Sequence, residues 1–195
     1  MEYEKLRKLK NKLFFTIEDL AYIFKIKPSS AKVMCSRYVK KEIFIRIKNN
    51  FYILRDKWEN LSTTDFFRLA NFLQVPSYIS FMSGLSFYEV TTQVQRNFFE
   101  SAAVRRSVRF EAEEAVFNFY KLKKNLYFDF IKDNNIFIAT KEKAFIDSVY
   151  LYSFGKYKLD IDSIDFDKLN KERIKKIIKV YPQKTKVIIK KLCKI

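Results

Sequence analysis

Glycine is the residue whose scarcity most limits what this chain can fold into, because only Gly84 and Gly155 occur among its 195 residues. The loops that cradle phosphates, and the tight turn of the dinucleotide-binding fold, need several glycines at fixed spacings. Neither loop can be built from this sequence. Histidine is absent altogether, which excludes Ser-His and Cys-His catalytic pairs and every histidine metal ligand. We therefore expect no enzyme activity, no metal site and no cofactor.

The remaining composition is typical of a folded protein without a membrane span. Hydrophobic residues make up 48% of the chain and charged residues 31%, which suffices for one large domain or two small ones. Cys35 and Cys193 lack neighbouring ligands, so neither a zinc site nor a disulfide framework is implied. The uncharged stretch 69–88 carries Gln74 and Pro76, which a bilayer core disfavours. These features predict a cytoplasmic protein that does not enter the membrane.

Positive charge is concentrated at the two ends of the chain. The formal net charge is +17, from 39 Lys and Arg against 22 Asp and Glu. Residues 1–60 and 156–195 each contribute +8, whereas residues 61–155 contribute +1. Two separate basic regions indicate two surfaces that meet polyanions such as nucleic acid. Codon bias in an AT-rich genome is the alternative explanation of the lysine excess.

The first sixty residues follow the pattern of a winged helix-turn-helix domain. Residues 2–12 carry one apolar stripe among charges, which predicts a surface helix. The Thr16 side chain can cap a second helix, and the Asp19 side chain, three residues later, can complete a capping box. This helix is expected to end near Lys25. Pro28 favours the start of a third helix. Alternating residues after that helix predict a hairpin that turns at two asparagines and serves as the wing.

The third helix combines an apolar face with a face of short hydroxyls and long cations. Ala31, Cys35 and Tyr38 fall on the apolar face, so we interpret Cys35 as a core residue. The opposite face and the hairpin tip suit a major groove and its flanking phosphates. A protein-docking module can use the same elements, but their order favours DNA binding. The predicted DNA-binding residues are Lys27, Ser29, Ser30, Lys32, Ser36, Arg37, Lys40, Arg46, Lys48, Asn49 and Asn50.

Residues 61–195 are predicted to form a second domain, and the fold class is α+β. An apolar helix is expected over residues 65–73, and Phe72 is among the side chains expected to pack inward. Residues 78–88 indicate a turn and a short helix with Gly84 at a close contact. Short aromatic and β-branched segments then predict an antiparallel sheet. These segments are residues 94–99, 104–110, 115–121, 126–130 and 135–139, and a helix capped by Thr140 follows them to Phe154.

Two segments carry a resemblance to a known family. Residues 78–88, YISFMSGLSFY, resemble the Tyr-Ile-Ser, Ser-Ala-Leu segment of the AbiEi-like type IV abortive-infection antitoxins. Residues 138–147, IATKEKAFID, are similar to the Ile-Ala, Glu-Lys-Ala, Asp segment of that family, and both occur in the family's order. The resemblance covers residues 5 to about 180. It departs from the family at Gly84, where alanine is commoner, and over residues 100–114.

The resemblance implies a fold and a function. The family joins an N-terminal winged helix-turn-helix to an α+β antitoxin domain, so we expect domains at residues 1–60 and 61–195. The implied function is to repress its own operon by binding inverted repeats in promoter DNA. The implied partner is a nucleotidyltransferase-like toxin encoded beside it, counteracted directly or functionally in phage defence. A solitary winged-helix regulator and a nucleic-acid-processing enzyme remain the alternatives.

The basic tail, residues 156–195, is predicted to be helical with a break at Pro182. Leu169, Ile174 and Val187 are among the apolar residues expected to pack on the domain, with the lysines facing a nucleic acid or an acidic partner. A helix that lies on a membrane surface is the alternative. The predicted partner surface consists of Lys168, Lys171, Arg173, Lys175, Lys176, Lys179, Lys184 and Lys186.

Two groups of carboxylates are candidate metal ligands. Glu142 and Asp147 stand five positions apart, about 140° around a helix, so a cap and a buried polar contact are the favoured interpretation. The aspartates from Asp160 to Asp167 are spaced as in a cation-binding loop, but this segment lacks the glycine that such a loop needs at its bend. Asp165 is therefore expected to cap a helix.

Overall fold

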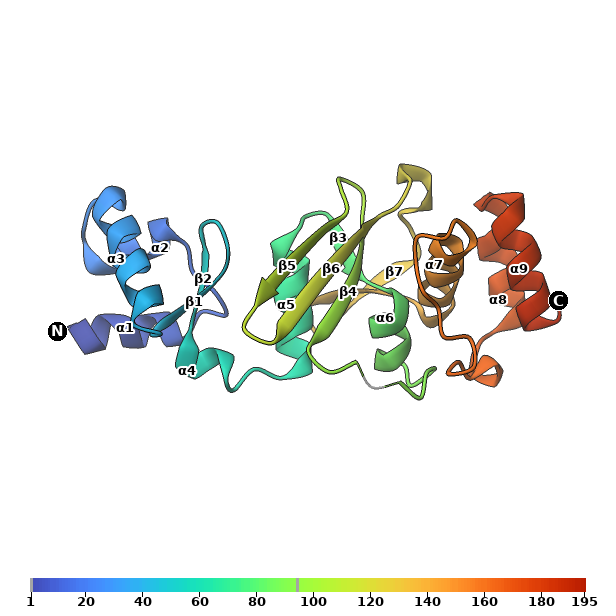
Figure 1. The fold of residues 1–195 in the computed structure, drawn as a ribbon, viewed down its shortest axis with the longest axis horizontal. Coiled ribbons are helices and arrows are strands. Elements are labelled where there is room, and N and C mark those ends of the chain that lie inside the picture. Colours follow the sequence, from blue (N-terminus) through green and yellow to red (C-terminus); the bar gives the residue numbers. More distant parts are fainter. Residues whose placement is uncertain (1, 94) are drawn as a thin grey trace. The chain divides into compact units, whose positions relative to one another are not determined.

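A computed structural model describes residues 2–93 and 95–195, with side chains described from Leu6 onward. The chain divides into two compact units (Figure 1). The first comprises the residues up to 69 together with 110–115, and the second comprises 70–109 together with 116–195. Each unit has a hydrophobic core of its own. The α+β class predicted from the sequence is confirmed.

The first unit begins with three helices and a hairpin. Their order is α1 (Glu2–Lys10), α2 (Ile17–Phe24), α3 (Pro28–Lys40), β1 (Phe44–Lys48), β2 (Phe51–Leu54) and α4 (Arg55–Trp58), before α5 (Thr63–Leu73). Thr16 and Asp19 form the predicted capping box, in which the Thr16 hydroxyl accepts from the Asp19 N–H and the Asp19 carboxylate accepts from the Thr16 N–H. Lys25 ends α2 in the left-handed region, with φ of 55°.

A small sheet closes the core of the first unit. β1 and β2 are antiparallel. Phe15 pairs with Tyr52 of β2 as an isolated antiparallel bridge, through two backbone hydrogen bonds of 2.8 and 2.9 Å. Phe15 and Tyr38 both meet the Phe44 ring edge-on, which joins α3 to the hairpin. Cys35 is fully buried, as expected, and burial raises its pKa to about 11.

Most of a six-stranded sheet belongs to the second unit, with helices of α and 3₁₀ type before and after its long helix, while residues 110–112 of the edge strand belong to the first unit. The strand order is β5-β6-β4-β3-β8-β7. The strands are β3 (Ser77–Ile79), β4 (Phe98–Ala103), β5 (Val108–Ala112), β6 (Ala115–Lys121), β7 (Phe130–Asp133) and β8 (Ile136–Ala139). The helices are α6 (Phe81–Phe87), η1 (Lys124–Leu126), α7 (Lys141–Ser153), η2 (Phe166–Lys168), α8 (Lys171–Ile177), η3 (Ile178–Val180) and α9 (Gln183–Cys193).

The expectation of a purely antiparallel sheet is wrong. β4 pairs with β6 in parallel, from Phe98 opposite Val116 to Ala103 opposite Lys121, and β3 pairs with β8 in parallel. β5 lies at the edge of the sheet, and β6 lies between β5 and β4. The order of the strands in the sheet therefore differs from their order in the sequence. Short strands with similar composition do not reveal this order. The strand expected over residues 94–99 begins four residues later, and residue 94 lies outside the described residues.

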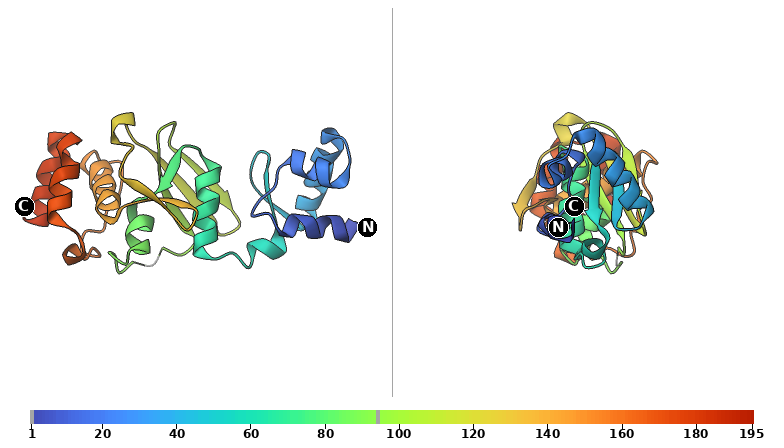
Figure 2. Two further views of the ribbon diagram at one scale, coloured as in Figure 1. Left: turned by 180° about the vertical axis from the view of Figure 1, so that it is seen from behind. Right: turned by 90° about the vertical axis from the view of Figure 1, so that its left-hand side faces the viewer.

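Helices α6 and α7 pack closely at the centre of the second unit. A Cβ built on Gly84 would lie 2.9 Å from the Ala144 Cβ, so the predicted close contact at Gly84 is confirmed. Thr140 caps α7, also as predicted, by accepting from the Lys143 N–H. α7 is buried on almost all its faces, and α8 and α9 lie beside it (Figure 1, Figure 2).

Two side chains expected in the core are exposed. Phe72 is 53% exposed although most apolar residues of α5 are buried. Val187 is 56% exposed because the buried face of α9 consists of Thr185, Ile189 and Cys193, which are spaced by four residues. The break at Pro182 is where the sequence places it.

Candidate functional site

The predicted DNA-binding residues on α3 form one exposed face. Tyr38, Cys35 and Ala31 hold the other side of the helix in the core. No residue of the exposed face takes part in an ion pair within the described residues, so its cations are available to phosphates. The residues of this face are Lys27, Ser29, Ser30, Lys32, Ser36, Arg37 and Lys40, all exposed.

Side-chain hydrogen bonds hold the hairpin tip in place. Asn50 turns the chain with φ of 57°, and its side chain accepts from the Ile17 N–H at 2.7 Å and donates to Glu18 at 2.9 Å. This hydrogen bond lowers the pKa of the Glu18 carboxyl. Asn50 thus anchors the tip to the start of α2. Arg46 is exposed on β1, with weak contacts to the Lys48 carbonyl and the Asn49 side chain.

The predicted partner surface lies on η2, α8, η3 and α9, and its cations differ in whether they form ion pairs. Arg173 pairs with Asp129 at 2.7 Å, Lys175 pairs with Glu172 at 2.8 Å, and Lys168 lies 3.8 Å from Asp165. Lys184 lies over a phenylalanine ring. The others, Lys171, Lys176, Lys179 and Lys186, make no ion pair among the described residues. These unpaired lysines leave this end of the unit strongly basic.

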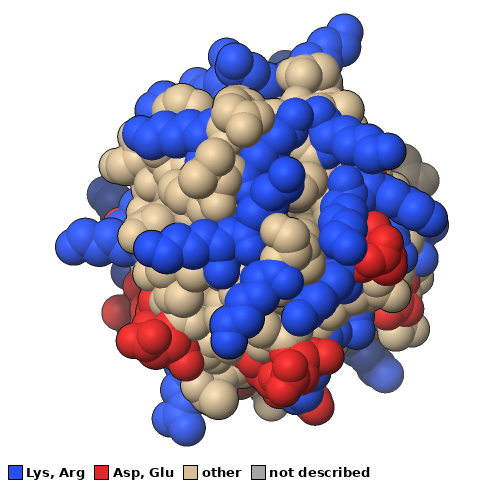
Figure 3. All heavy atoms as spheres, turned by 90° about the vertical axis from the view of Figure 1, so that its right-hand side faces the viewer, with Lys and Arg blue, Asp and Glu red and all other residues tan. Residues whose placement is uncertain are grey.

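Lysine and arginine side chains are spread over much of this basic end. Figure 3 shows them interspersed with uncharged side chains, and the acidic side chains lie at the lower left, the lower edge and the right of the view. A shallow hollow of about 360 Å³ on the unit is lined by Ile178, Ile195 and the four lysines Lys175, Lys179, Lys186 and Lys190. Like charges held this close attract polyanions and repel other cations.

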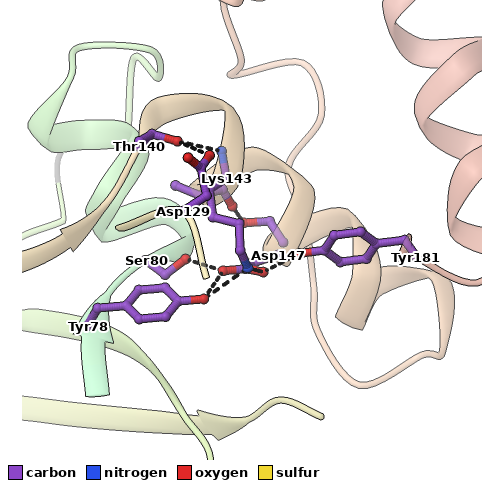
Figure 4. A network of polar contacts seen from close by, with 9 residues as sticks. Tyr78, Ser80, Asp129, Thr140, Lys143, Asp147 and Tyr181 are labelled. Atoms are coloured by element: carbon purple, nitrogen blue, oxygen red, sulfur yellow. Dashed lines mark hydrogen bonds and ion pairs between the residues drawn. The ribbon is translucent and has the colours of Figure 1, made fainter. Parts of the chain in front are cut away.

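A buried polar cluster connects residues 78–88 with residues 138–147 (Figure 4). Asp147 on α7 accepts hydrogen bonds from Tyr78 at 3.0 Å, Ser80 at 2.9 Å and Tyr181 at 3.0 Å. Lys143, one helical turn earlier, forms an ion pair with Asp147 and donates to the Tyr78 hydroxyl at 2.9 Å. Both members of the ion pair have no solvent exposure.

Aromatic rings surround the ammonium group of Lys143. Its Nζ lies 5.5 Å from the ring centre of Tyr78, 5.3 Å from that of Phe128 and 5.6 Å from that of Tyr181. Burial lowers the pKa of Lys143, and the neighbouring Asp147 opposes that shift. Burial also raises the pKa of Tyr78 and of Tyr181 well above the usual value. The hydroxyls of Tyr78 and Tyr181 therefore stay protonated at neutral pH.

Polar contacts continue from the cluster toward the surface. Asp129 accepts from the Thr140 hydroxyl at 2.7 Å and from Arg173 at 2.7 Å. Glu142 accepts from the Asn170 N–H at 3.1 Å, and its carboxylate also lies 3.6 Å from Arg173. These contacts tie α8 to α7. Glu142 and Asp147 accordingly serve separate structural contacts, which agrees with the interpretation favoured from their spacing.

A scan against protein-family models finds no match, and a search of curated proteins finds no matching sequence. Within the described residues, no group of three or more Cys, Asp or Glu side chains is arranged to hold a metal ion. Asp165 caps η2 through the Asp167 N–H, as predicted. No helix in the described part of the chain has the length and apolar character needed to cross a membrane.

Sequence reasoning missed two buried ionic groups, Lys143 and Glu100. A signal for Lys143 exists, because a lysine four residues before Asp147 can form an ion pair with it on one face of a helix, and apolar residues follow on the other faces. Glu100 gives no such signal. It lies in β4, is 3% exposed, and meets Tyr157 and Tyr120, which are distant in sequence.

Proposed function

We propose that this chain is a DNA-binding antitoxin: its first unit represses its own promoter, and its second unit counteracts a nucleotidyltransferase-like toxin. The exposed face of α3 carries this proposal. Its seven polar residues combine hydroxyls and cations on one side of a helix that α2, the hairpin and Phe15 hold in place. Three helices followed by a hairpin, with the cations on the third helix, suit docking in a major groove.

The antitoxin part of the proposal draws support from the second unit. The segments that resemble the AbiEi-like family, residues 78–88 and 138–147, pack against each other through Gly84 and Ala144. They also share the Tyr78–Asp147 hydrogen bond. Two similar segments that build one core support a common fold more strongly than two scattered surface matches would. The basic face of α8 and α9 is then the surface proposed for an acidic or nucleic-acid partner.

A salt titration tests the DNA-binding part. Fluorescence anisotropy of the full chain with labelled DNA from upstream of its own gene should show affinity that falls with salt, with a log-log slope of roughly −0.9 per phosphate contacted. Lys40→Ala should weaken binding and reduce that slope by about one contact. Lys8→Ala removes the same charge from α1 and serves as the matched control. Absence of binding at low salt would overturn the proposal.

A solitary winged-helix regulator would use the same α3 face. It differs from the antitoxin in having no effect on cells that express a toxin from an unrelated promoter. The protection assay argued at the end of the Discussion separates these two functions.

A further inference from the structure

A separate cavity of about 540 Å³ opens in the second unit, between β4, β6 and the chain that follows α7. Its lining changes from the inside outward. Glu100 is almost fully buried, Phe98, Tyr120 and Tyr157 are partly buried, and Lys156 and Lys158 are exposed. A volume of this size is typical of sites for small molecules. Neither the α3 face nor the basic face of α8 and α9 includes these residues.

Glu100 is held in place from three sides and still has room for a donor. Its Oε2 accepts from the Tyr157 hydroxyl at 2.7 Å and from the Met82 N–H at 3.1 Å. Its Oε1 accepts a long hydrogen bond, of 3.3 Å, from Tyr120, and the backbone N–H of Ser83 also lies near the carboxylate. A carboxylate oxygen can accept two hydrogen bonds, so Oε1 can accept another N–H at the inner end of the cavity. Burial raises the pKa of Glu100 to about 7, so the carboxyl is mostly ionised at pH 8.

The outer part of the cavity is suited to an anion. Lys156 and Lys158 line it, and neither makes an ion pair among the described residues. Asp160 is the opposing charge at the same opening, and Gln93 already donates a hydrogen bond to it. The rings of Phe98, Tyr120 and Tyr157 also line the cavity and offer aromatic surface to a flat ligand. Tyr120 and Tyr157 hydrogen-bond to the Glu100 carboxylate, and Tyr157 stands between the two lysines in the chain.

We propose that this cavity binds one nucleotide, with the base against the aromatic rings, an amino group of the base donating to Glu100, and the phosphate at Lys156 and Lys158. The order of carboxylate, aromatic surface and cations matches the order of amino group, ring and phosphate in an amino-bearing nucleotide. Unpaired bases are recognised in this way, by stacking on aromatic side chains and hydrogen bonding at their edges. The inference does not depend on the proposed DNA binding by α3.

Cytosine and uracil form a matched pair for testing this recognition. Cytosine presents a 4-amino donor that a glutamate accepts, whereas uracil presents a 4-oxo acceptor that the carboxylate repels. Calorimetric titration of the full chain at pH 8 should therefore show CMP binding at least about tenfold more tightly than UMP. Cytidine, which lacks the phosphate, should bind more weakly than CMP.

Three variants assign the contacts. Glu100→Gln should remove the preference for CMP over UMP, because its amide can donate to the uracil oxygen. Lys156→Ala/Lys158→Ala should weaken CMP binding to the level of cytidine and leave the base preference intact. The control Lys123→Ala/Lys124→Ala removes two exposed lysines outside the cavity and should change neither quantity. If Glu100→Gln lowers the melting temperature greatly, the lysine variant alone decides the phosphate contact.

The source of the nucleotide is decided by comparing CMP with short single strands of dC and dT. Tighter binding of the dC strand than of CMP, lost in Glu100→Gln, would assign the cavity to an unpaired nucleotide of a nucleic acid. Equal or weaker binding of the strand would assign it to a free nucleotide. Absence of CMP and dC binding at millimolar concentration, or equal affinities for CMP and UMP, would overturn the proposal.

Discussion

The hydroxyl of Tyr78 donates a hydrogen bond of 3.0 Å to the carboxylate of Asp147, although 69 positions separate the two residues. Tyr78 lies in β3 of the sheet and Asp147 in the middle of α7, so this bond joins a strand to the central helix. Lys143 contacts both groups. The three side chains thus form one polar cluster, in which the hydrogen bonds of each group depend on the other two.

Removing one member of the buried ion pair should be costly. Lys143→Met leaves the Asp147 carboxylate buried without its cation, and we expect a loss of about 3–5 kcal/mol in the free energy of unfolding. Urea denaturation followed by circular dichroism measures this loss. Lys141→Met is the matched control on the same helix and should change stability by less than about 0.5 kcal/mol, since Lys141 is only partly buried. A similar small effect for Lys143→Met would mean that the pair does not stabilise the fold.

A second prediction concerns the packing of α6 on α7. Gly84→Ala places a methyl group 2.9 Å from the Ala144 Cβ, so the helices must separate, at a cost of about 1–3 kcal/mol. Ala144→Gly opens the same space and should recover part of the loss in the double variant, although glycine within a helix costs about 1 kcal/mol itself. Additive losses in a double-mutant cycle would contradict the contact. Ser86→Ala on α6 is the control.

Glu100 should make stability depend on pH in an unusual direction. Its pKa rises from 4.5 to about 7 in the folded chain because the carboxyl is buried, so the folded state binds the proton more strongly than the unfolded state does. The stability contributed by this proton is complete below pH 4.5 and is lost as the pH rises through 7. The loss amounts to roughly 3 kcal/mol.

The measurement is the difference between the chain and Glu100→Gln in the free energy of unfolding at pH 5 and pH 8. The difference isolates Glu100 from carboxyls such as Asp19 and Asp65, whose pKa values are lowered and which lose stabilising charge in acid. The decline from pH 5 to pH 8 should be present in the unaltered chain and much smaller in the variant. Equal pH profiles would show that Glu100 does not titrate in this range.

Local signals explain which parts of the fold could be predicted from the sequence. Thr16 with Asp19, and Pro28 at the start of α3, are determined by residues within one helical turn, and these predictions are confirmed. The caps at Thr140 and Asp165 are confirmed for the same reason. Each of these residues satisfies backbone groups that lie beside it in the chain.

Long-range relationships explain what could not be predicted. The parallel pairing of β4 with β6 depends on where β5 is placed, and no residue in β5 specifies that place. The exposure of Phe72 depends on which face of α5 meets the rest of the chain. Asn50 was expected at a DNA-facing tip, and its contacts with Ile17 and Glu18 arise because the hairpin returns to the start of α2. The cavity at Glu100 likewise draws on three segments.

The two proposed activities should be separable within the full chain. The toxin is expressed from an inducible promoter that this chain does not regulate, so any protection is independent of repression. Arg37→Ala/Lys40→Ala removes two exposed cations from the α3 face and should abolish promoter binding, because those side chains point away from the core. The same variant should still protect cells at the level of the unaltered chain.

The basic face of α8 and α9 should behave in the opposite way. Lys176→Ala/Lys179→Ala removes two lysines without ion pairs among the described residues, which lowers the positive potential there without exposing the core. We expect colony survival to fall while promoter affinity of the first unit changes little. Lys123→Ala/Lys124→Ala has the same charge change outside this face and should preserve survival. Loss of protection in the α3 variant, with retention in the α8 and η3 variant, would reverse the assignment of roles, because neutralisation would then depend on DNA binding by the first unit.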